Sequence, residues 1–270
     1  MSLLEVIILA VVQGLTEFLP VSSSGHLVVA SAVLDALGGQ PPSDLLEVNI
    51  VLHLGTLLAI LVYFWREIWQ LLGRDRRLIP LLAVGTLPAV VIGLPLKEYG
   101  ADFLENPLLA GCMFPVTALL LLWASWQPPG EISYRDLSYG AAIKIGLLQA
   151  LALLPGISRS GATIAGGLAV GSNRRSAGIF AFLLAIPAIG GAGLLEVVKL
   201  AQQHAESSGA ATAAATTTPA VLALGALVST VVGFVALHWL VRWIEQGRLA
   251  IFAWYLLPLG AAVVGWQLMK

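Results

Sequence analysis

The sequence predicts an all-α polytopic membrane protein with six transmembrane helices and two re-entrant helical hairpins arranged as inverted repeats. Three observations favour this fold: the composition, an internal repeat of two polar motifs, and the alternation of basic and acidic loops. The 270 residues are 58% hydrophobic and only 11% charged, whereas soluble domains carry about 25% charged residues. The net charge of −1 gives no basic footprint for nucleic acid. We therefore expect one integral membrane domain over 1–270, with repeat halves near 1–126 and 137–270.

Six apolar stretches are long enough to cross the hydrocarbon core of a bilayer, which takes about twenty residues. They lie near 47–65, 78–97, 107–126, 176–200, 219–243 and 250–269. Two further regions, 3–35 and 138–172, each hold a polar Pro-Gly-Ser break between two apolar runs. Non-helical backbone at membrane depth is tolerated only where protein or a cavity surrounds it. We therefore expect both regions to be re-entrant hairpins whose tips meet near the midplane.

The internal repeat links these two regions. Gln13 to His26 reads QGLTEFLPVSSSGH, and Gln149 to Ala162 reads QALALLPGISRSGA. Gln, Leu-Pro and Ser-x-Ser-Gly recur in the same order, with a one-residue slip between the prolines and the other matched positions. Repeats of this kind are the sequence signature of a duplicated structural unit.

The charges of the loops indicate how the two halves are oriented. The basic residues Arg66, Arg74, Arg76, Arg77, Arg135, Arg174, Arg175, Arg242 and Arg248 lie in alternate loops, and the intervening loops are acidic or neutral. Since cytoplasmic loops carry an excess of Lys and Arg, all basic loops fall on one side if the hairpins do not cross. Three crossings per half then make the repeats inverted, an arrangement that places binding sites at the repeat interface.

The second motif, LLPGISRSGATIAGG from Leu153 to Gly167, concentrates polar groups between apolar runs. A charged residue at membrane depth is costly and usually functional, which singles out Arg159. Its guanidinium fork suits phosphate, neighbouring hydroxyls add donors, and glycines let an anion approach the backbone closely. The motif predicts a phosphate cradle formed by Ser158, Arg159, Ser160, Gly161 and Thr163.

The first motif supplies groups that could carry chemistry. Glu17 lies in an apolar run, one helical turn after Gln13, so it could be a general base or a divalent-cation ligand. His26 could assist a serine nucleophile or protonate a leaving group. Anion binding at a helix N-terminus would involve Ser22, Ser23, Ser24 and Gly25. At most one of the three serines is expected to be the nucleophile, and their spacing does not choose it.

Glu47 and His53, in the next apolar stretch, could also reach the site. The sequence alone does not show the direction in which either side chain faces.

With QGLTEFLPVSSSGH and PGISRSGAT, the chain resembles the bacterial undecaprenyl-pyrophosphate phosphatase family of the bacitracin-resistance type, from end to end. The resemblance implies hydrolysis of undecaprenyl pyrophosphate to undecaprenyl phosphate, which recycles the lipid carrier for peptidoglycan synthesis, and dependence on Mg²⁺ or Ca²⁺. By motif position it implies Glu17, Ser23, His26 and Arg159 as catalytic residues. The family's first signature has Glu or Gln before Glu17, and Gln13 here leaves Glu17 as the only carboxylate of the pair.

The expected location is the bacterial plasma membrane, with the active site open to the extracytoplasmic side. The expected partners are the polyprenyl pyrophosphate substrate and membrane lipids, and a homodimer is left open. An inverted-repeat transporter or flippase for a polyprenyl phosphate or another anion is the main alternative, because broken helices are frequent in such proteins. An intramembrane serine protease is a weaker one, because Arg159 fits it poorly.

Overall fold

A computed structural model describes residues 1–36, 45–128, 130–207 and 217–270. Within these ranges the chain is helical, apart from short connections and an isolated bridge between Ile132 and Ser172. The helices are α1 (Leu3–Phe18), α2 (Ser23–Ala36), α3 (Leu45–Tyr63), α4 (Trp65–Leu71), α5 (Leu78–Tyr99), α6 (Ala101–Leu104), α7 (Pro107–Trp126), the 3-10 helix η1 (Tyr134–Asp136), α8 (Tyr139–Leu151), α9 (Arg159–Ala169), α10 (Arg174–Ser207), α11 (Pro219–Glu245) and α12 (Ala250–Leu268).

Five of the described helices, α5, α7, α10, α11 and α12, are long and apolar enough to cross a membrane, and their positions match the predicted stretches. The sixth predicted stretch, 47–65, corresponds to α3, after which the chain bends by 78° into α4. The bend follows from a change in environment: Phe64 is buried against Phe182, with ring centroids 5.6 Å apart, while Trp65 and Trp69 are exposed. Exposed tryptophans of this kind favour the membrane interface. The prediction of an all-helical, multi-pass membrane protein is confirmed.

Each of the two motif regions forms a pair of short helices around a break. α1 and α2 contain 16 and 14 residues, and α8 and α9 contain 13 and 11 residues. All four are shorter than the roughly twenty residues that a complete crossing requires. The breaks follow from local chemistry, because Pro20 and Pro155 lack a backbone donor and Gly156 has a φ of 94°. Ser22 also lies in the left-handed region, at φ 70°.

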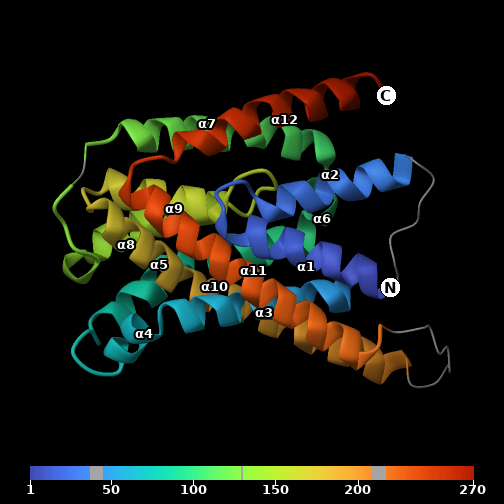
Figure 1. The fold of residues 1–270 in the computed structure, drawn as a ribbon, viewed down its shortest axis with the longest axis horizontal. Coiled ribbons are helices and arrows are strands. Elements are labelled where there is room, and N and C mark those ends of the chain that lie inside the picture. Colours follow the sequence, from blue (N-terminus) through green and yellow to red (C-terminus); the bar gives the residue numbers. More distant parts are fainter. Residues whose placement is uncertain (37–44, 129, 208–216) are drawn as a thin grey trace.

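Helices from the beginning and the end of the chain pack together. α1 packs against α11, which also contacts α3, and α8 packs against α5. α7 and α12 lie side by side, as Figure 1 shows, and α7 also contacts α2 and α9. The contact between α5 and α8 is close: a Cβ placed on Gly146 would lie 2.3 Å from the carbonyl oxygen of Gly85. Small residues allow such close backbone packing between membrane helices.

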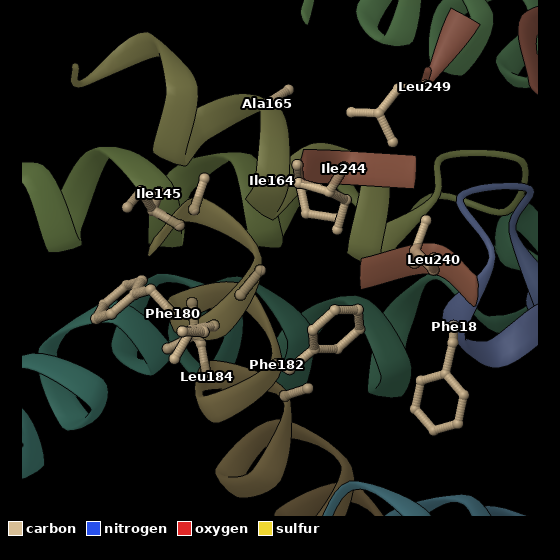
Figure 2. Packing of buried hydrophobic residues seen from close by; sticks show 14 of the residues in the cluster. Phe18, Ile145, Ile164, Ala165, Phe180, Phe182, Leu184, Leu240, Ile244 and Leu249 are labelled. Carbon is tan, nitrogen blue, oxygen red and sulfur yellow. The ribbon is translucent and has the colours of Figure 1, made fainter. Parts of the chain in front are cut away.

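The main hydrophobic cluster joins the two broken regions to the long helix α10. Figure 2 shows Phe180, Phe182 and Leu184 of α10 near Ile145 of α8 and Ile164 of α9. Phe182 also makes an edge-to-face contact with Phe18 at the end of α1, with ring centroids 6.1 Å apart. Because Phe18 follows Glu17 directly, this packing fixes the last turn of α1, from which Glu17 projects.

Arg135 connects the loop between α4 and α5 to the segment that precedes α8. Its Nε donates to Asp75 Oδ2 over 2.8 Å, and its NH2 donates to Gln70 Oε1 over 2.7 Å. The hydrogen bond to Asp75 raises the pKa of the Arg135 guanidinium. Arg135 therefore also stabilises the packing of the basic loops against each other.

Candidate active site

The two breaks contact each other through the side chain of Ser22 and the backbone of Gly156. The Ser22 hydroxyl accepts hydrogen bonds from the N–H groups of Gly156, at 3.1 Å, and Gly25, at 3.3 Å. Thr117 of α7 holds the second break from the other side: its hydroxyl donates to the Gly156 carbonyl over 2.8 Å and accepts from Ser158 N over 3.1 Å. Ser22 and Thr117 are both buried. The two motifs that the repeat identified are therefore in direct contact.

The contact between the breaks leaves no space for a side chain on Gly25. A Cβ there would lie 2.6 Å from the backbone nitrogen of Gly156 and 2.8 Å from its Cα. We expect Gly25→Ala to separate the breaks and to cost about 1–3 kcal/mol, as overpacking does. Thermal unfolding in detergent would measure the loss as a lower Tm. Gly265→Ala is the control, because no atom lies within 4 Å of the added carbon. Equal Tm values for both variants would contradict the close contact.

A buried carboxylate, Glu17, is the centre on which both broken regions converge. Glu17 Oε1 accepts a hydrogen bond from Arg159 NH2 over 2.7 Å, and Oε2 accepts from Ser23 Oγ over 3.1 Å. Gln13, one turn earlier on α1, donates its amide nitrogen to Oε2 over 3.0 Å. We call these four residues the Glu17 centre.

The electrostatics of the Glu17 centre favour an anion. Ser23 and Arg159 are the first residues of α2 and α9, so two helix N-termini with their partial positive charge lie beside Glu17. The side chains of Glu17 and Arg159 are only 7% and 20% exposed, and the carboxylate balances the guanidinium. Arg159 NH1 is buried and has no hydrogen-bond partner in the described part of the chain. A buried guanidinium nitrogen without a partner is a donor that a phosphate oxygen could satisfy.

Both ring nitrogens of His26 have partners other than Ser23. Nδ1 is 2.7 Å from the Ser22 carbonyl oxygen, and Nε2 is 2.7 Å from the Tyr255 hydroxyl. A carbonyl only accepts, so Nδ1 carries the proton and, in the neutral ring, Nε2 accepts from Tyr255. The Tyr255 ring also stacks on the imidazole, with centroids 5.7 Å apart. Of the two candidate bases, Glu17 is therefore the one in contact with the Ser23 hydroxyl.

The other predicted residues lie at the starts of α2 and α9. Ser158 caps α9 by accepting from Gly161 N over 3.1 Å, and its hydroxyl is 3.1 Å from that of Ser160. Thr163 is buried and donates to the Arg159 carbonyl over 2.8 Å. Ser24 is exposed at the start of α2, with its hydroxyl 3.4 Å from that of Ser22. These contacts give Ser158 and Thr163 a role in holding the first turn of α9, on which Arg159 lies.

Three residues in contact with this region were missed or left undecided by the sequence. His53 projects from α3 and places Nε2 3.7 Å from Glu17 Oε2, a direction that its sequence position could not reveal. Thr117 and Tyr255 are isolated polar residues in apolar helices, far from either motif. Only the polarity of Thr117 within an otherwise apolar span could have drawn attention to it.

The described residues suit a hard divalent cation only in part. They contain no group of three or more His, Cys, Asp or Glu side chains arranged to hold a metal. Glu17 Oε2 and Ser23 Oγ nevertheless lie 3.1 Å apart as oxygen donors, while Gln13 turns its amide nitrogen toward Glu17. Mg²⁺ is commonly held by one or two carboxylates together with substrate phosphates, so these residues fit an ion that is shared with a phosphorylated substrate.

Two broken helical regions, in which the N-termini of α2 and α9 lie beside one buried Glu–Arg pair, define a multi-pass membrane protein with an ion pair in its interior. Residues 6–262 match the model of the family described as bacitracin resistance protein BacA. The chain belongs to this family.

Proteins called undecaprenyl-diphosphatase are similar over nearly the whole chain. A relative from Rhodopirellula baltica is 48% identical over 263 residues, covering 97% of each chain. One from Methanosphaera stadtmanae is 35% identical and covers 98% of each chain. Undecaprenyl-diphosphatase 4 of Bacillus cereus is 38% identical over 99% of this chain and 98% of its own. The family resemblance expected from the two motifs is therefore confirmed.

Proposed function

We propose that this protein is an integral membrane phosphatase that hydrolyses undecaprenyl pyrophosphate to undecaprenyl phosphate and inorganic phosphate. The observation that carries the proposal is the Ser23 hydroxyl, which donates to Glu17 beside the guanidinium of Arg159. A nucleophile, a base and a cationic fork are the groups that phosphoryl transfer requires. The product would return the lipid carrier to peptidoglycan synthesis, and this recycling would confer bacitracin resistance.

In this proposal the pyrophosphate binds to Arg159 and to the N-termini of α2 and α9. Arg159 NH1, which lacks a partner among the described residues, would bind the terminal phosphate, with the N-termini of α2 and α9 adding backbone donors. The residues that we assign to pyrophosphate binding are Ser22, Ser24, Gly25, Ser158, Arg159, Ser160, Gly161 and Thr163. Several of these act by holding the backbone, as Ser22, Ser158 and Thr163 do.

The chemical step begins at Ser23. Its Oγ attacks the terminal phosphorus while Glu17 Oε2 accepts the hydroxyl proton. The bond between that phosphorus and the bridging oxygen breaks, and undecaprenyl phosphate leaves. The oxygen of a water molecule then bonds to the phosphorus of the phosphoserine as the phosphorus–Oγ bond breaks. Ser23 Oγ takes the proton held by Glu17, the water gives a proton to Glu17 and from there to solvent, and inorganic phosphate leaves. His26, hydrogen-bonded to Tyr255, is a second proton donor or acceptor for the phosphate groups.

A divalent cation, Mg²⁺ or Ca²⁺, belongs to the proposal. Glu17 would hold it, with Gln13 nearby, and the ion would neutralise negative charge on the pyrophosphate. Mg²⁺ and Ca²⁺ both prefer oxygen ligands, which is the donor type that Glu17 and Ser23 supply.

We further propose six transmembrane helices, with α3 and α4 counted as one span, and two re-entrant hairpins arranged as inverted repeats. In Figure 1 the first hairpin (α1 and α2) lies toward the right end of the molecule, and α8, with the start of the second hairpin, toward the left end. The equivalent packing of α1 against α11 and of α8 against α5 supports the repeat.

The proposed location is the bacterial plasma membrane, with the centre open to the extracytoplasmic side. Access along the first hairpin is supported by exposure: Ser24 at the start of α2 is exposed, whereas residues 160–168 of α9 are all buried. The alternation of basic and acidic loops supports an outside position for the first hairpin. The proposed partners are the substrate and membrane lipids. A homodimer would contribute no residue to the Glu17 centre, because one chain supplies all four.

Phosphate release from a long-chain polyprenyl pyrophosphate by detergent-purified protein tests this function. We expect release with Mg²⁺ or Ca²⁺, loss with EDTA, and recovery when the cation is returned. Glu17→Gln, which removes the base but keeps the side-chain shape, should lower kcat by about 10²–10⁴-fold. Glu105→Gln, an exposed position, is the matched control. Folded protein that releases no phosphate would contradict the proposal, and carriage of the lipid phosphate across liposomes would then favour the flippase.

A further inference from the structure

The position of His53 determines which of its ring nitrogens faces Glu17. Nδ1 lies 2.8 Å from the carbonyl oxygen of Asn49, one turn earlier on α3. A carbonyl oxygen only accepts hydrogen bonds, so Nδ1 carries a proton. In the neutral imidazole, Nε2 then presents an unprotonated lone pair, and this is the atom that lies 3.7 Å from Glu17 Oε2. An electron pair and a carboxylate oxygen therefore face each other.

Two electron-rich donors placed in this way are stabilised by a positive species between them, either a proton on Nε2 or a metal ion. The separation of 3.7 Å exceeds the roughly 3.2 Å limit of an N–H···O hydrogen bond. Two neighbouring ligands that are each about 2.1 Å from one octahedral ion lie about 3.0 Å apart, which is less than the separation of 3.7 Å. Only a small movement of the half-buried His53 ring would bring both atoms to one ion. Orientation of a ligating imidazole by a backbone carbonyl at its other nitrogen is a recurring feature of metal sites.

We propose that His53 is a ligand of the divalent cation at Glu17, so that the ion is held by Glu17 Oε2 and His53 Nε2 next to Gln13. The inference rests on the proposed function, because it assumes that a cation acts at this centre. It also gives a reason for Gln13. Gln13 contacts the same oxygen, Oε2, that His53 faces. Because Gln13 supplies no carboxylate, the His53 imidazole would be the second ligand beside Glu17. Mn²⁺ shares the preference of Mg²⁺ and Ca²⁺ for oxygen donors, but as a transition-metal ion it also accepts imidazole, so it is a suitable probe.

Mn²⁺ bound to the detergent-purified full chain is the probe, and pulsed electron paramagnetic resonance is the readout. A coordinated imidazole nitrogen modulates the Mn²⁺ echo at ¹⁴N frequencies, whereas oxygen ligands do not. We expect this modulation in the wild type, its loss in His53→Gln, and its retention in His238→Gln, a histidine that packs against Tyr63. The free Mn²⁺ signal should also show that His53→Gln weakens binding at least tenfold.

A second variant separates loss of the ligand from loss of the fold. Gln13→Glu combined with His53→Gln places a carboxylate beside Glu17, and it should restore Mn²⁺ affinity to within about threefold of the wild type without ¹⁴N modulation. The inference would be overturned by bound Mn²⁺ without ¹⁴N modulation in the wild type, by modulation that persists in His53→Gln, or by failure of the double variant to regain affinity. Phosphate release measured on the same samples keeps the two proposals distinct: cation-dependent release without a nitrogen ligand would reject only the role of His53.

Discussion

Ser23→Ala is expected to abolish turnover, with a loss of at least about 10⁴-fold in kcat, because the proposed reaction has no other attacking group in contact with Glu17. The hydroxyl is the only part of the side chain that bonds to the carboxylate, at 3.1 Å. Its removal leaves the Arg159–Glu17 pair in place. Substrate binding should therefore survive, and KM should change far less than kcat in a phosphate-release assay.

Two other serines are controls for the Ser23 variant. Ser31→Ala, further along α2, removes an exposed hydroxyl outside the proposed site and should keep activity within about threefold, as surface substitutions usually do. Ser22→Ala instead removes the acceptor of two backbone N–H groups. It should therefore lower the free energy of unfolding by about 1–3 kcal/mol, which a lower Tm would report. Near-normal kcat in Ser23→Ala would show that water attacks directly, and the covalent step would have to be abandoned.

Arg159→Ala is the second large effect, and we expect kcat/KM to fall at least about 10³-fold, as for other arginines that stabilise phosphoryl transfer. The substitution removes both the contact with Glu17 and the unpartnered NH1 donor. It also leaves a buried carboxylate without its counter-charge, which costs about 3–5 kcal/mol when a buried pair is broken. Turnover and Tm should therefore be measured on the same preparation.

Two further variants separate charge from geometry at Arg159. Arg159→Lys keeps the positive charge and should recover the Tm, but it lacks the planar fork and should remain well below wild-type activity. Arg175→Ala removes a 72% exposed arginine that pairs loosely with Glu245, and it should have little effect. If Arg159→Ala were as active as Arg175→Ala, the guanidinium would not bind the phosphate.

The elements of this fold were predictable because each depends on local chemistry. Apolar length predicted α5, α7, α10, α11 and α12, and the prolines and serines predicted the two breaks. The 78° bend after α3 was not predicted, because it depends on the burial of Phe64 against Phe182, a residue far away in the chain. Periodicity within one helix carries no information about such a partner.

The site was predictable to the level of its motifs but not of its contacts. Glu17 and Arg159 could be singled out because charge at membrane depth is costly, but their hydrogen bond depends on the packing of α1 and α9. The repeat is also a poor guide to chemistry. Gln149 matches Gln13, yet the residue one turn later is Leu153 rather than a carboxylate, and neither polar atom of the buried Gln149 side chain has a partner in the described part of the chain. The direction of His53 required the fold.

The packing of α1 against α11 has a consequence for biogenesis. α1 is the first helix to leave the ribosome, and α11 is the last but one. During synthesis the first hairpin, with Glu17 and Ser23, is therefore made long before α11, the helix against which α1 packs. The surface of α1 that α11 covers stays without its partner until translation is almost complete, although Arg159, which pairs with Glu17, is made earlier. A chain truncated before Pro219 should consequently be recognised as unfinished by membrane quality control, even though both motifs would already be present in it.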